Sequence, residues 1–281
     1  MAQPVKRFTL LSRVILLLLL FPPFNIFAAH DNVMKKPLWE FGLGVGGLNV
    51  PDYRGSDERR SILFPIPYFV YRGDRLFVDR RGARGLIYES GNLAVNISGD
   101  LGLPVNSDKN QARSGMPDLD IAFLLGPSFD YLIYDKPQSG SSLTFKVPMQ
   151  LVITTDFSSV DTQGWFSFPH FNYIHKADWT LGTTLGLTFA SKDFHNYYYG
   201  VAPQFATTDR PAYDASGGYS GFRTSFTLSK RFRRFWIGTA MRYQYLGGTV
   251  FEDSPLLKQN YSLAISAGIS WILFSSSERE K

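Results

Sequence analysis

The histidines are the side chains of this sequence that could support hydrolytic chemistry. There are four of them, His30, His170, His175 and His195. A serine-type hydrolase needs a serine beside a histidine and a third polar group that orients the ring. Ser167 precedes His170 on one predicted strand, but an odd spacing directs the two side chains to opposite faces. We therefore expect no catalytic residue, and a lipid-modifying enzyme using His170 or His195 ranks as a distant third hypothesis.

Composition removes several other classes of chemistry. No pair of histidines stands at ligand-like spacing with a carboxylate, so we expect no metal site and no cofactor. The chain has no cysteine, which excludes disulfides and thiol chemistry. Its formal net charge of +5 comes largely from the N-terminal segment, and the other basic residues form no stripe with interleaved aromatics. Nucleic-acid binding is therefore not expected.

Charged residues gather at two short predicted connections. The first contains Lys176 and Asp178, and the second contains Lys230, Arg231, Arg233 and Arg234. Solvated turns account for both groups, whereas contact with anionic headgroups or acidic partners is the functional alternative. Arg223 and Arg242 lie instead on the polar side of predicted strands, where they are candidate lumen residues.

The elements that hold these residues are strands with alternating apolar and polar positions. In 179–189 the apolar set is Trp179, Leu181, Leu185, Leu187 and Phe189, and it alternates with threonine and glycine. The segment 261–273 repeats this pattern. One face of such a strand suits lipid and the other suits a lumen, as in a transmembrane β-barrel. Tryptophans 39, 179 and 271 lie near the same predicted ends, where an interface girdle is expected.

Counting such segments predicts an all-β, antiparallel transmembrane barrel of about twelve strands, with ten as the fallback. The predicted strands are 38–47, 60–71, 75–80, 85–89, 92–103, 119–134, 141–155, 163–175, 178–190, 218–230, 234–247 and 259–273. Their connections are alternately long and short, which places the short ones in the periplasm. Five prolines, at 65, 67, 127, 148 and 169, fall inside these strands, and we interpret each as a bulge or a strand end.

The N-terminus has the layout of a secretory signal peptide, with cations before the apolar run 14–21 and small residues at 28 and 29. The sequence therefore predicts a cleaved signal peptide at 1–28 and one barrel domain at 29–281, located in the outer membrane of a Gram-negative cell. A periplasmic β-sandwich or a lipocalin-like barrel would also alternate, but with shorter strands around a shared apolar interior.

The predicted outer loop 191–217 carries the most distinctive motif. Its residues are Tyr199, Gly200, Arg210, Pro211, Tyr213, Gly217 and Gly218. A loop of this length is commonly functional or folded into the barrel mouth, and a surface cap is the alternative. With Pro65-Ile66-Pro67-Tyr68 and Gly126-Pro127-Ser128, the motif resembles the MipA/OmpV family of outer-membrane proteins over about residues 38–273. The chain departs from the usual barrel terminus, since Leu273 stands where an aromatic residue is usual.

The resemblance implies a structural role without catalytic residues. The family's namesake is a scaffold between a lytic transglycosylase and a murein synthase, so our first hypothesis is a non-enzymatic scaffold for such peptidoglycan enzymes. Its candidate contacts are Lys176, Asp178, Arg231 and Arg233. The alternative is a narrow pore or small-solute channel in which Arg223 and Arg242 tune ion selectivity. Outer-membrane lipids and lipopolysaccharide are further expected partners, and the oligomeric state stays open.

Overall fold

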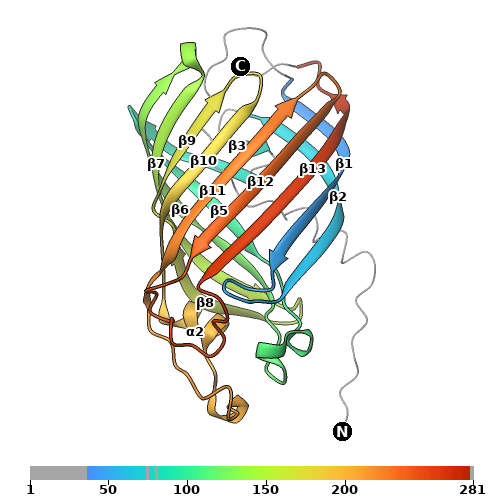
Figure 1. Ribbon diagram of the computed structural model, residues 1–281. Helices are drawn as coiled ribbons and strands as arrows, with labels where there is room; N and C mark the ends of the chain where they lie inside the picture. Colours follow the sequence, from blue (N-terminus) through green and yellow to red (C-terminus); the bar gives the residue numbers. More distant parts are fainter. Residues whose placement is uncertain (1–36, 74–75, 80–81, 279–281) are drawn as a thin grey trace.

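The computed structural model describes residues 37–73, 76–79 and 82–278, without the side chains of 76–79 and 82–85. The predicted signal peptide, its cleavage site and His30 lie outside these residues. The described chain forms one antiparallel sheet rolled into a barrel of tilted strands (Figure 1). No helix in the described ranges is long and apolar enough to cross a membrane.

The sheet contains thirteen strands in an order that closes on itself. They are β1 (Trp39–Pro51), β2 (Arg59–Arg72), β3 (Leu76–Asp79), β4 (Gly82–Ser90), β5 (Leu93–Gly102), β6 (Ile121–Lys136), β7 (Ser141–Thr155), β8 (Val160–Ser167), β9 (His170–Lys176), β10 (Thr180–Ala190), β11 (Gly218–Arg231), β12 (Phe235–Tyr245) and β13 (Tyr261–Ser275). β1 pairs with β13, and β10 pairs with β11, so the first and last strands meet. β8 and β9 both lie between β7 and β10, which leaves twelve strand positions around the barrel.

The predicted count of twelve is therefore confirmed, and the fallback of ten is wrong. The segment predicted as one strand at 163–175 is broken at Phe168 and Pro169 into β8 and β9. Proline has no N–H for the ladder, and here the chain uses the Pro169 carbonyl instead, which accepts from Leu187 N at 3.1 Å.

Interpreting all five prolines as bulges or strand ends is wrong for four of them. Only Pro169 lies at a break, whereas Pro65, Pro67, Pro127 and Pro148 pair in register with the neighbouring strand. The register shifts lie elsewhere, for example between Thr188 and Phe189. Pairing between β6 and β7 skips the residues around Pro127 without changing register, so the strand continues through the proline.

The outer surface of the barrel is largely apolar on the strands whose side chains the structure describes. Outward positions of the strands carry exposed large apolar side chains, among them Leu43, Leu125, Leu185, Phe226 and Ile265. The three tryptophans of the predicted girdle, Trp39, Trp179 and Trp271, are exposed on the same surface. An apolar belt of this kind suits contact with lipid.

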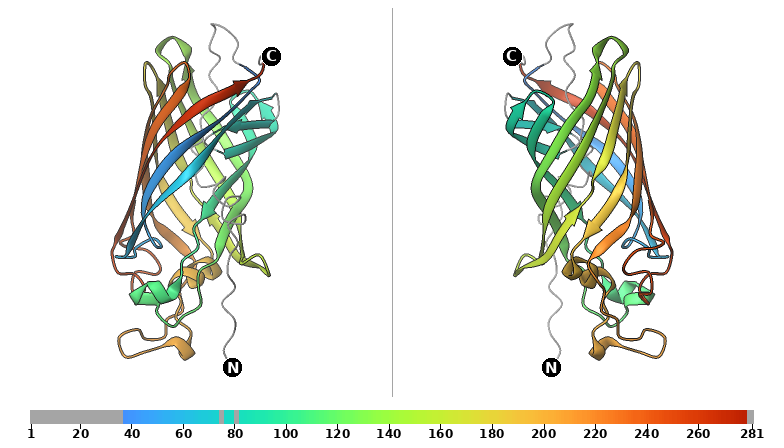
Figure 2. Two further views of the ribbon diagram at one scale, coloured as in Figure 1. Left: turned by 90° about the vertical axis from the view of Figure 1, so that its right-hand side faces the viewer. Right: turned by 90° about the vertical axis from the view of Figure 1, so that its left-hand side faces the viewer.

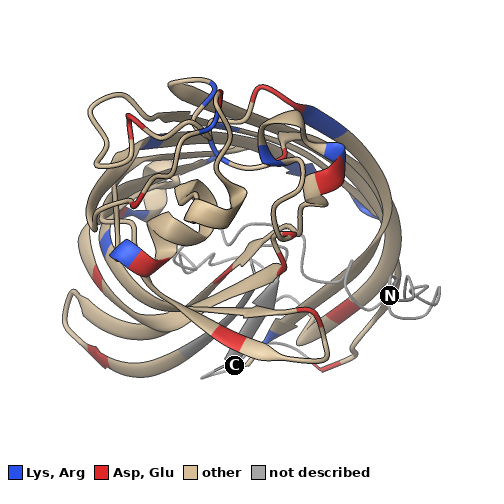
Figure 3. Cartoon of the chain, turned by 90° about the horizontal axis from the view of Figure 1, so that it is seen from below, with Lys and Arg blue, Asp and Glu red and all other residues tan. Residues whose placement is uncertain are grey.

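The two ends of the barrel differ, and we name them by their connections. The long-loop end carries the connections 52–58, 103–120, 191–217 and 246–260, while the short-turn end carries 91–92, 137–140, 177–179 and 232–234 together with the start of β1 and the end of β13. The long loops and helix α2 (Lys192–Tyr199) gather at the bottom of Figure 1. Seen from that end in Figure 3, acidic and basic residues are mixed over the loops.

The long loops pack together into a plug at the long-loop end. Phe194 of α2 packs against the inward-facing residues Leu124, Val152 and Phe166 of the wall. Beside it, the Tyr199 ring stacks on the Phe251 ring, with 3.8 Å between centroids. Other buried members of the plug come from four separate connections: Tyr53, Val105, Leu119, Ala215 and Leu246.

One side of the wall lacks backbone pairing, and we call this region the seam. β3 pairs with β2 only at Tyr71 and Arg72, and β4 pairs with β5 only up to Ile97. No described residue pairs with the edge of β2 over 59–70 on this side. In the left view of Figure 2, β2 and β5 diverge below the short β3 and β4.

The prolines of β2 face this seam. At both ends of β2, backbone groups of even-numbered residues bond towards β1, since Arg72 N donates to Leu38 O and Glu58 O accepts from Asp52 N. The register between these points is unbroken, so the odd-numbered positions point to the other side. Pro65 and Pro67 therefore remove two N–H groups from the unpaired edge, as prolines on edge strands do.

Candidate functional site

The two charged turns named from the sequence lie next to each other at the short-turn end. The β9–β10 turn and the β11–β12 turn are neighbours because β10 pairs with β11. Lys230 Nζ lies 3.6 Å from Asp178 Oδ2, and the same ammonium lies 5.6 Å from the ring centroids of Trp179 and Phe232. We call this region, with Lys176, Asp178, Lys230, Arg231, Arg233 and Arg234, the basic turn pair.

Arg231 is anchored to the inside of the barrel. Its Nη2 donates to Glu40 Oε1 at 2.9 Å, while Tyr68 Oη donates to Glu40 Oε2 at 2.8 Å. Arg72 Nη2 adds a second cation at 3.6 Å from the same carboxylate. Glu40 is only 1% exposed, so it depends on these partners to offset the cost of burying its charge. Arg231 is thus partly committed to this network, although 39% of its side chain is exposed.

The remaining predicted contacts differ in how much of them reaches solvent. Arg233, Arg234 and Asp178 are exposed, and Lys176 is half-buried. The rings of Phe232 and Phe235 stack at 4.4 Å beneath Arg233 and Arg234, which fixes the turn that carries them. The exposed cations of the basic turn pair are therefore held on a rigid turn at the rim.

The two candidate lumen residues, Arg223 and Arg242, face inward. Arg223 is 7% exposed, and its guanidinium lies 4.6 Å from the ring centroid of Phe168. Arg242 lines the same small cavity as Arg223. On β7 and β6, further along the same side of the barrel, Lys146 Nζ bonds to Asp130 Oδ2 at 2.5 Å in a buried ion pair.

Ser167 and His170 do not form a pair. Both are buried, and their hydrogen bonds go to backbone: Ser167 Oγ donates to Pro148 O at 2.7 Å, and His170 Nδ1 bonds to Phe168 O at 2.6 Å. The prediction that both residues lie on one continuous strand is wrong, because the break between β8 and β9 separates them.

Sequence reasoning missed a different serine–histidine contact. His195 Nδ1 lies 2.7 Å from Ser216 O, and its Nε2 lies 3.0 Å from Ser220 Oγ. Burial, together with the nearby Arg54, lowers the pKa of His195 to about 4, although the hydrogen bond to Ser216 O acts in the opposite direction. His195 and Ser220 are both 0% exposed, so no substrate reaches them and the contact holds the plug together.

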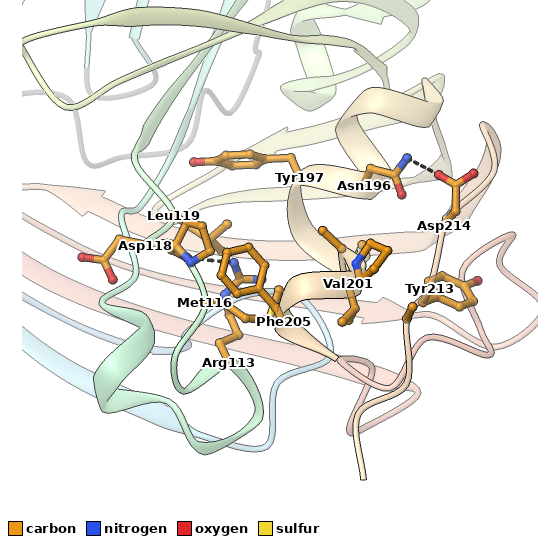
Figure 4. Close-up of a pocket in the computed structure, with 15 residues that line it drawn as sticks. Arg113, Met116, Asp118, Leu119, Asn196, Tyr197, Val201, Phe205, Tyr213 and Asp214 are labelled. Carbon is orange, nitrogen blue, oxygen red and sulfur yellow. Dashed lines mark hydrogen bonds between the residues drawn. The ribbon is translucent and has the colours of Figure 1, made fainter. Parts of the chain in front are cut away.

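The described residues contain no group of three or more histidines, cysteines or carboxylates that could hold a metal ion. They do contain a hollow of about 640 Å³ on the long-loop end, between α2, the loop 103–120 and the segment 200–214. Its walls are mainly apolar, including Met116, Leu119 and Phe205 (Figure 4). Its polar residues are already engaged, since Asn196 donates to Asp214 at 2.8 Å and Arg113 donates to Tyr198 O at 3.1 Å.

The motif of the 191–217 loop builds the plug and this hollow. Tyr199 is fully buried, and Gly200 ends α2. Arg210 donates to the carbonyls of Phe205, Ala112 and Ser114, which ties the loop to the neighbouring 103–120 loop. Gly218 has φ +139°, a conformation that favours glycine. In the structure these residues hold the loop together and pack it against the other long loops at the barrel mouth.

Comparison with known proteins identifies the family. The family model described as "MltA-interacting protein MipA" matches residues 43–273. The chain belongs to the MipA family. Among its relatives, outer membrane protein Omp26La of Vibrio anguillarum is 27% identical over 72% of this chain and 76% of its own length. Outer membrane protein OmpV of Vibrio cholerae is also 27% identical, over 36% of this chain and 40% of its own length.

Solved structures similar to this MipA-family protein share its kind of fold. An outer membrane channel from Pseudomonas putida F1 is 12% identical, with a TM-score of 0.44. The match covers 86% of this chain and 99% of the channel's own chain. The NanC porin is 10% identical with a TM-score of 0.40, covering 82% of this chain and 100% of its own. Both relatives are named outer membrane proteins, so the predicted location is confirmed. In such barrels the short turns face the periplasm.

Proposed function

We propose that this MipA-family barrel is a non-enzymatic scaffold that docks a periplasmic peptidoglycan enzyme on its basic turn pair. The observation that carries the proposal is the contact between the two charged turns, where Lys230 lies 3.6 Å from Asp178. This contact between the turns brings their exposed cations together on one part of the periplasmic rim. The family description names MltA as the interacting protein, which supports a lytic transglycosylase as partner, and the resemblance adds a murein synthase.

The anchoring of these turns supports docking over mere solvation. Glu40 holds Arg231 from inside, and the stacked Phe232 and Phe235 rings fix the turn. Less conformational entropy is lost when a partner binds side chains that are already positioned. Cations at the rim of an interface mainly accelerate association and make it salt-dependent.

The test is binding of a purified lytic transglycosylase to the barrel in nanodiscs. Arg233→Glu and Arg234→Glu together should weaken affinity about tenfold or more, mainly through the association rate. Lys136→Glu, at the β6–β7 turn of the same rim, is the matched control and should change affinity less than about twofold. Arg231 is left intact because it bonds to Glu40. Equal affinity of the double variant and the control, with both barrels folded, would refute docking at this site.

A narrow pore is the second candidate function. The inward-facing Arg223 and Arg242 support it, since they would favour anions over cations. The plug opposes it, because Tyr199, Leu246 and Phe251 are completely buried across the long-loop end. Planar bilayer recordings decide between them: anion-selective steps that shift towards cations in Arg242→Glu would support a pore, and silence would exclude it.

A further inference from the structure

Two arginines, the half-buried Arg54 and the buried Arg223, share one aromatic ring where the plug meets the lumen. The Arg54 guanidinium, from the β1–β2 loop, lies 5.6 Å from the Phe166 centroid and 5.4 Å from the Phe194 centroid. The Arg223 guanidinium lies 5.2 Å from the same Phe166 ring. Attraction to ring faces offsets only part of the cost of removing a guanidinium from water.

Neither arginine has a carboxylate partner among the described residues. Arg54 Nη2 donates to Ser220 Oγ at 3.0 Å, but its Nη1 is buried without any hydrogen-bond partner. Arg223 has an uncharged acceptor, the amide oxygen of Gln244, at 3.2 Å from its Nε and 3.3 Å from Nη2. A cation without an opposite charge in direct contact is costly to bury, and the one carboxylate on the same cavity wall, Asp100, faces two arginines, Arg223 and Arg242.

A small cavity lies beside Arg223. Its volume is about 40 Å³, and its polar lining includes Arg242, Ser98, Gln150, Thr184 and Ser225. One water needs roughly 10–15 Å³ measured in this way, so the space holds about three waters or one tetrahedral oxyanion. Asp100 is the single carboxylate of the lining against the two guanidinium groups, which leaves a net positive charge.

We propose that this cavity binds a small tetrahedral oxyanion, phosphate or sulfate, between Arg223 and Arg242. The planar guanidinium of arginine presents paired N–H donors to such anions, and the serine and threonine hydroxyls can supply further donors. The bound anion would supply the missing negative charge next to the plug residue Arg54. This site is separate from the basic turn pair, so it stands or falls independently of the proposed docking.

The first experiment measures thermal unfolding of the refolded full barrel in phosphate-free detergent. Sodium phosphate or sulfate is titrated against sodium chloride at constant ionic strength. We expect a saturable rise in Tm of several degrees with the oxyanions but not with chloride. Arg242 is half-buried, so Arg242→Gln is the less disruptive of the two variants. It should weaken the effect of the oxyanions on Tm about tenfold, and so should Arg223→Gln. Lys136→Gln at the rim is the control and should titrate like the unmodified barrel.

A second measurement identifies the source of the anion and does not depend on the stability of a variant. Phosphorus-31 NMR of the unmodified barrel is recorded with added inorganic phosphate and, separately, as purified from membranes. A shifted line for added phosphate supports a free anion, whereas a tightly held lipid phosphorus signal lost in Arg242→Gln supports a lipid headgroup. An equal rise in Tm with chloride and oxyanions, or no bound phosphorus in either sample, would overturn the proposal.

Discussion

At the residue scale, the plug depends on a histidine that must stay neutral. His195 is buried between Ser216 O and Ser220 Oγ, and Arg54 also donates to Ser220 Oγ. Protonating the ring would place a cation beside Arg54 and remove the acceptor that Ser220 uses. The sequence could not predict the structural role of His195, because that role depends on Ser220 and Arg54, which lie far away along the chain.

Acid should therefore loosen the plug. The folded pKa of His195 is about 4, below the ordinary value of 6.5, so its contribution is complete above pH 6.5 and is lost as pH falls towards 4. The loss amounts to about 3 kcal/mol. His195→Asn, which keeps a donor for Ser216 O, should be destabilising at pH 7.5, and the difference from the unmodified chain should shrink by this amount at pH 4. Urea unfolding measures it, and a pH-independent difference would contradict the role of the neutral ring.

At the scale of elements, alternation in the sequence predicted nearly every strand because a lipid-facing wall imposes it on each strand separately. The same reasoning located the charged turns, since Lys176 and Arg233 follow directly from where strands end. It could not reveal the bond between Arg231 and Glu40, because that contact depends on how strands at opposite ends of the sequence meet when the barrel closes. The break at Pro169 and the true setting of Pro65 were likewise invisible without the partner strands.

The unpaired edge of β2 makes a prediction about amide exchange. Amides of Ile62, Phe64 and Tyr68 point to β1 and should be protected, whereas those of Ser61, Leu63 and Phe69 point to the seam. We expect the second group to exchange faster by about two orders of magnitude or more. Residue-resolved hydrogen exchange in detergent measures this, with β1 as the control strand because it is paired on both sides. Uniform protection along β2 would show that the edge is covered.

At the scale of the whole molecule, loops complete the closure that the backbone leaves open. Asn110, from the β5–β6 loop, donates to Asp52 Oδ2 at 3.0 Å and to Ser56 Oγ at 3.2 Å in the β1–β2 loop. Gln111 N also donates to Glu58 Oε1 at 2.5 Å. We call these contacts the latch, because they join the two sides of the seam at the long-loop end.

Removing the latch should loosen the loops before the barrel. Asn110→Ala leaves Asp52 without this donor and should cost about 2 kcal/mol, with faster proteolysis in 103–120. Asn106→Ala is the matched control, because Asn106 bonds to Lys109 N within its own turn. Cleavage rates measured in nanodiscs should rise for Asn110→Ala alone. Equal cleavage rates for the two variants would mean that the latch does not stabilise the loops.

The seam also has a mechanical consequence. A barrel whose strands are paired all the way round resists a change in cross-section. A barrel with an unpaired seam deforms most easily at the seam, and its stiffness there depends on the contacts that join the two sides. In this barrel those contacts are the latch. Its 103–120 loop also contacts α2 of the plug, because Arg113 donates a hydrogen bond to Tyr198 O. Lateral pressure from the bilayer at the seam therefore reaches the plug through the two loops of the latch, 52–58 and 103–120.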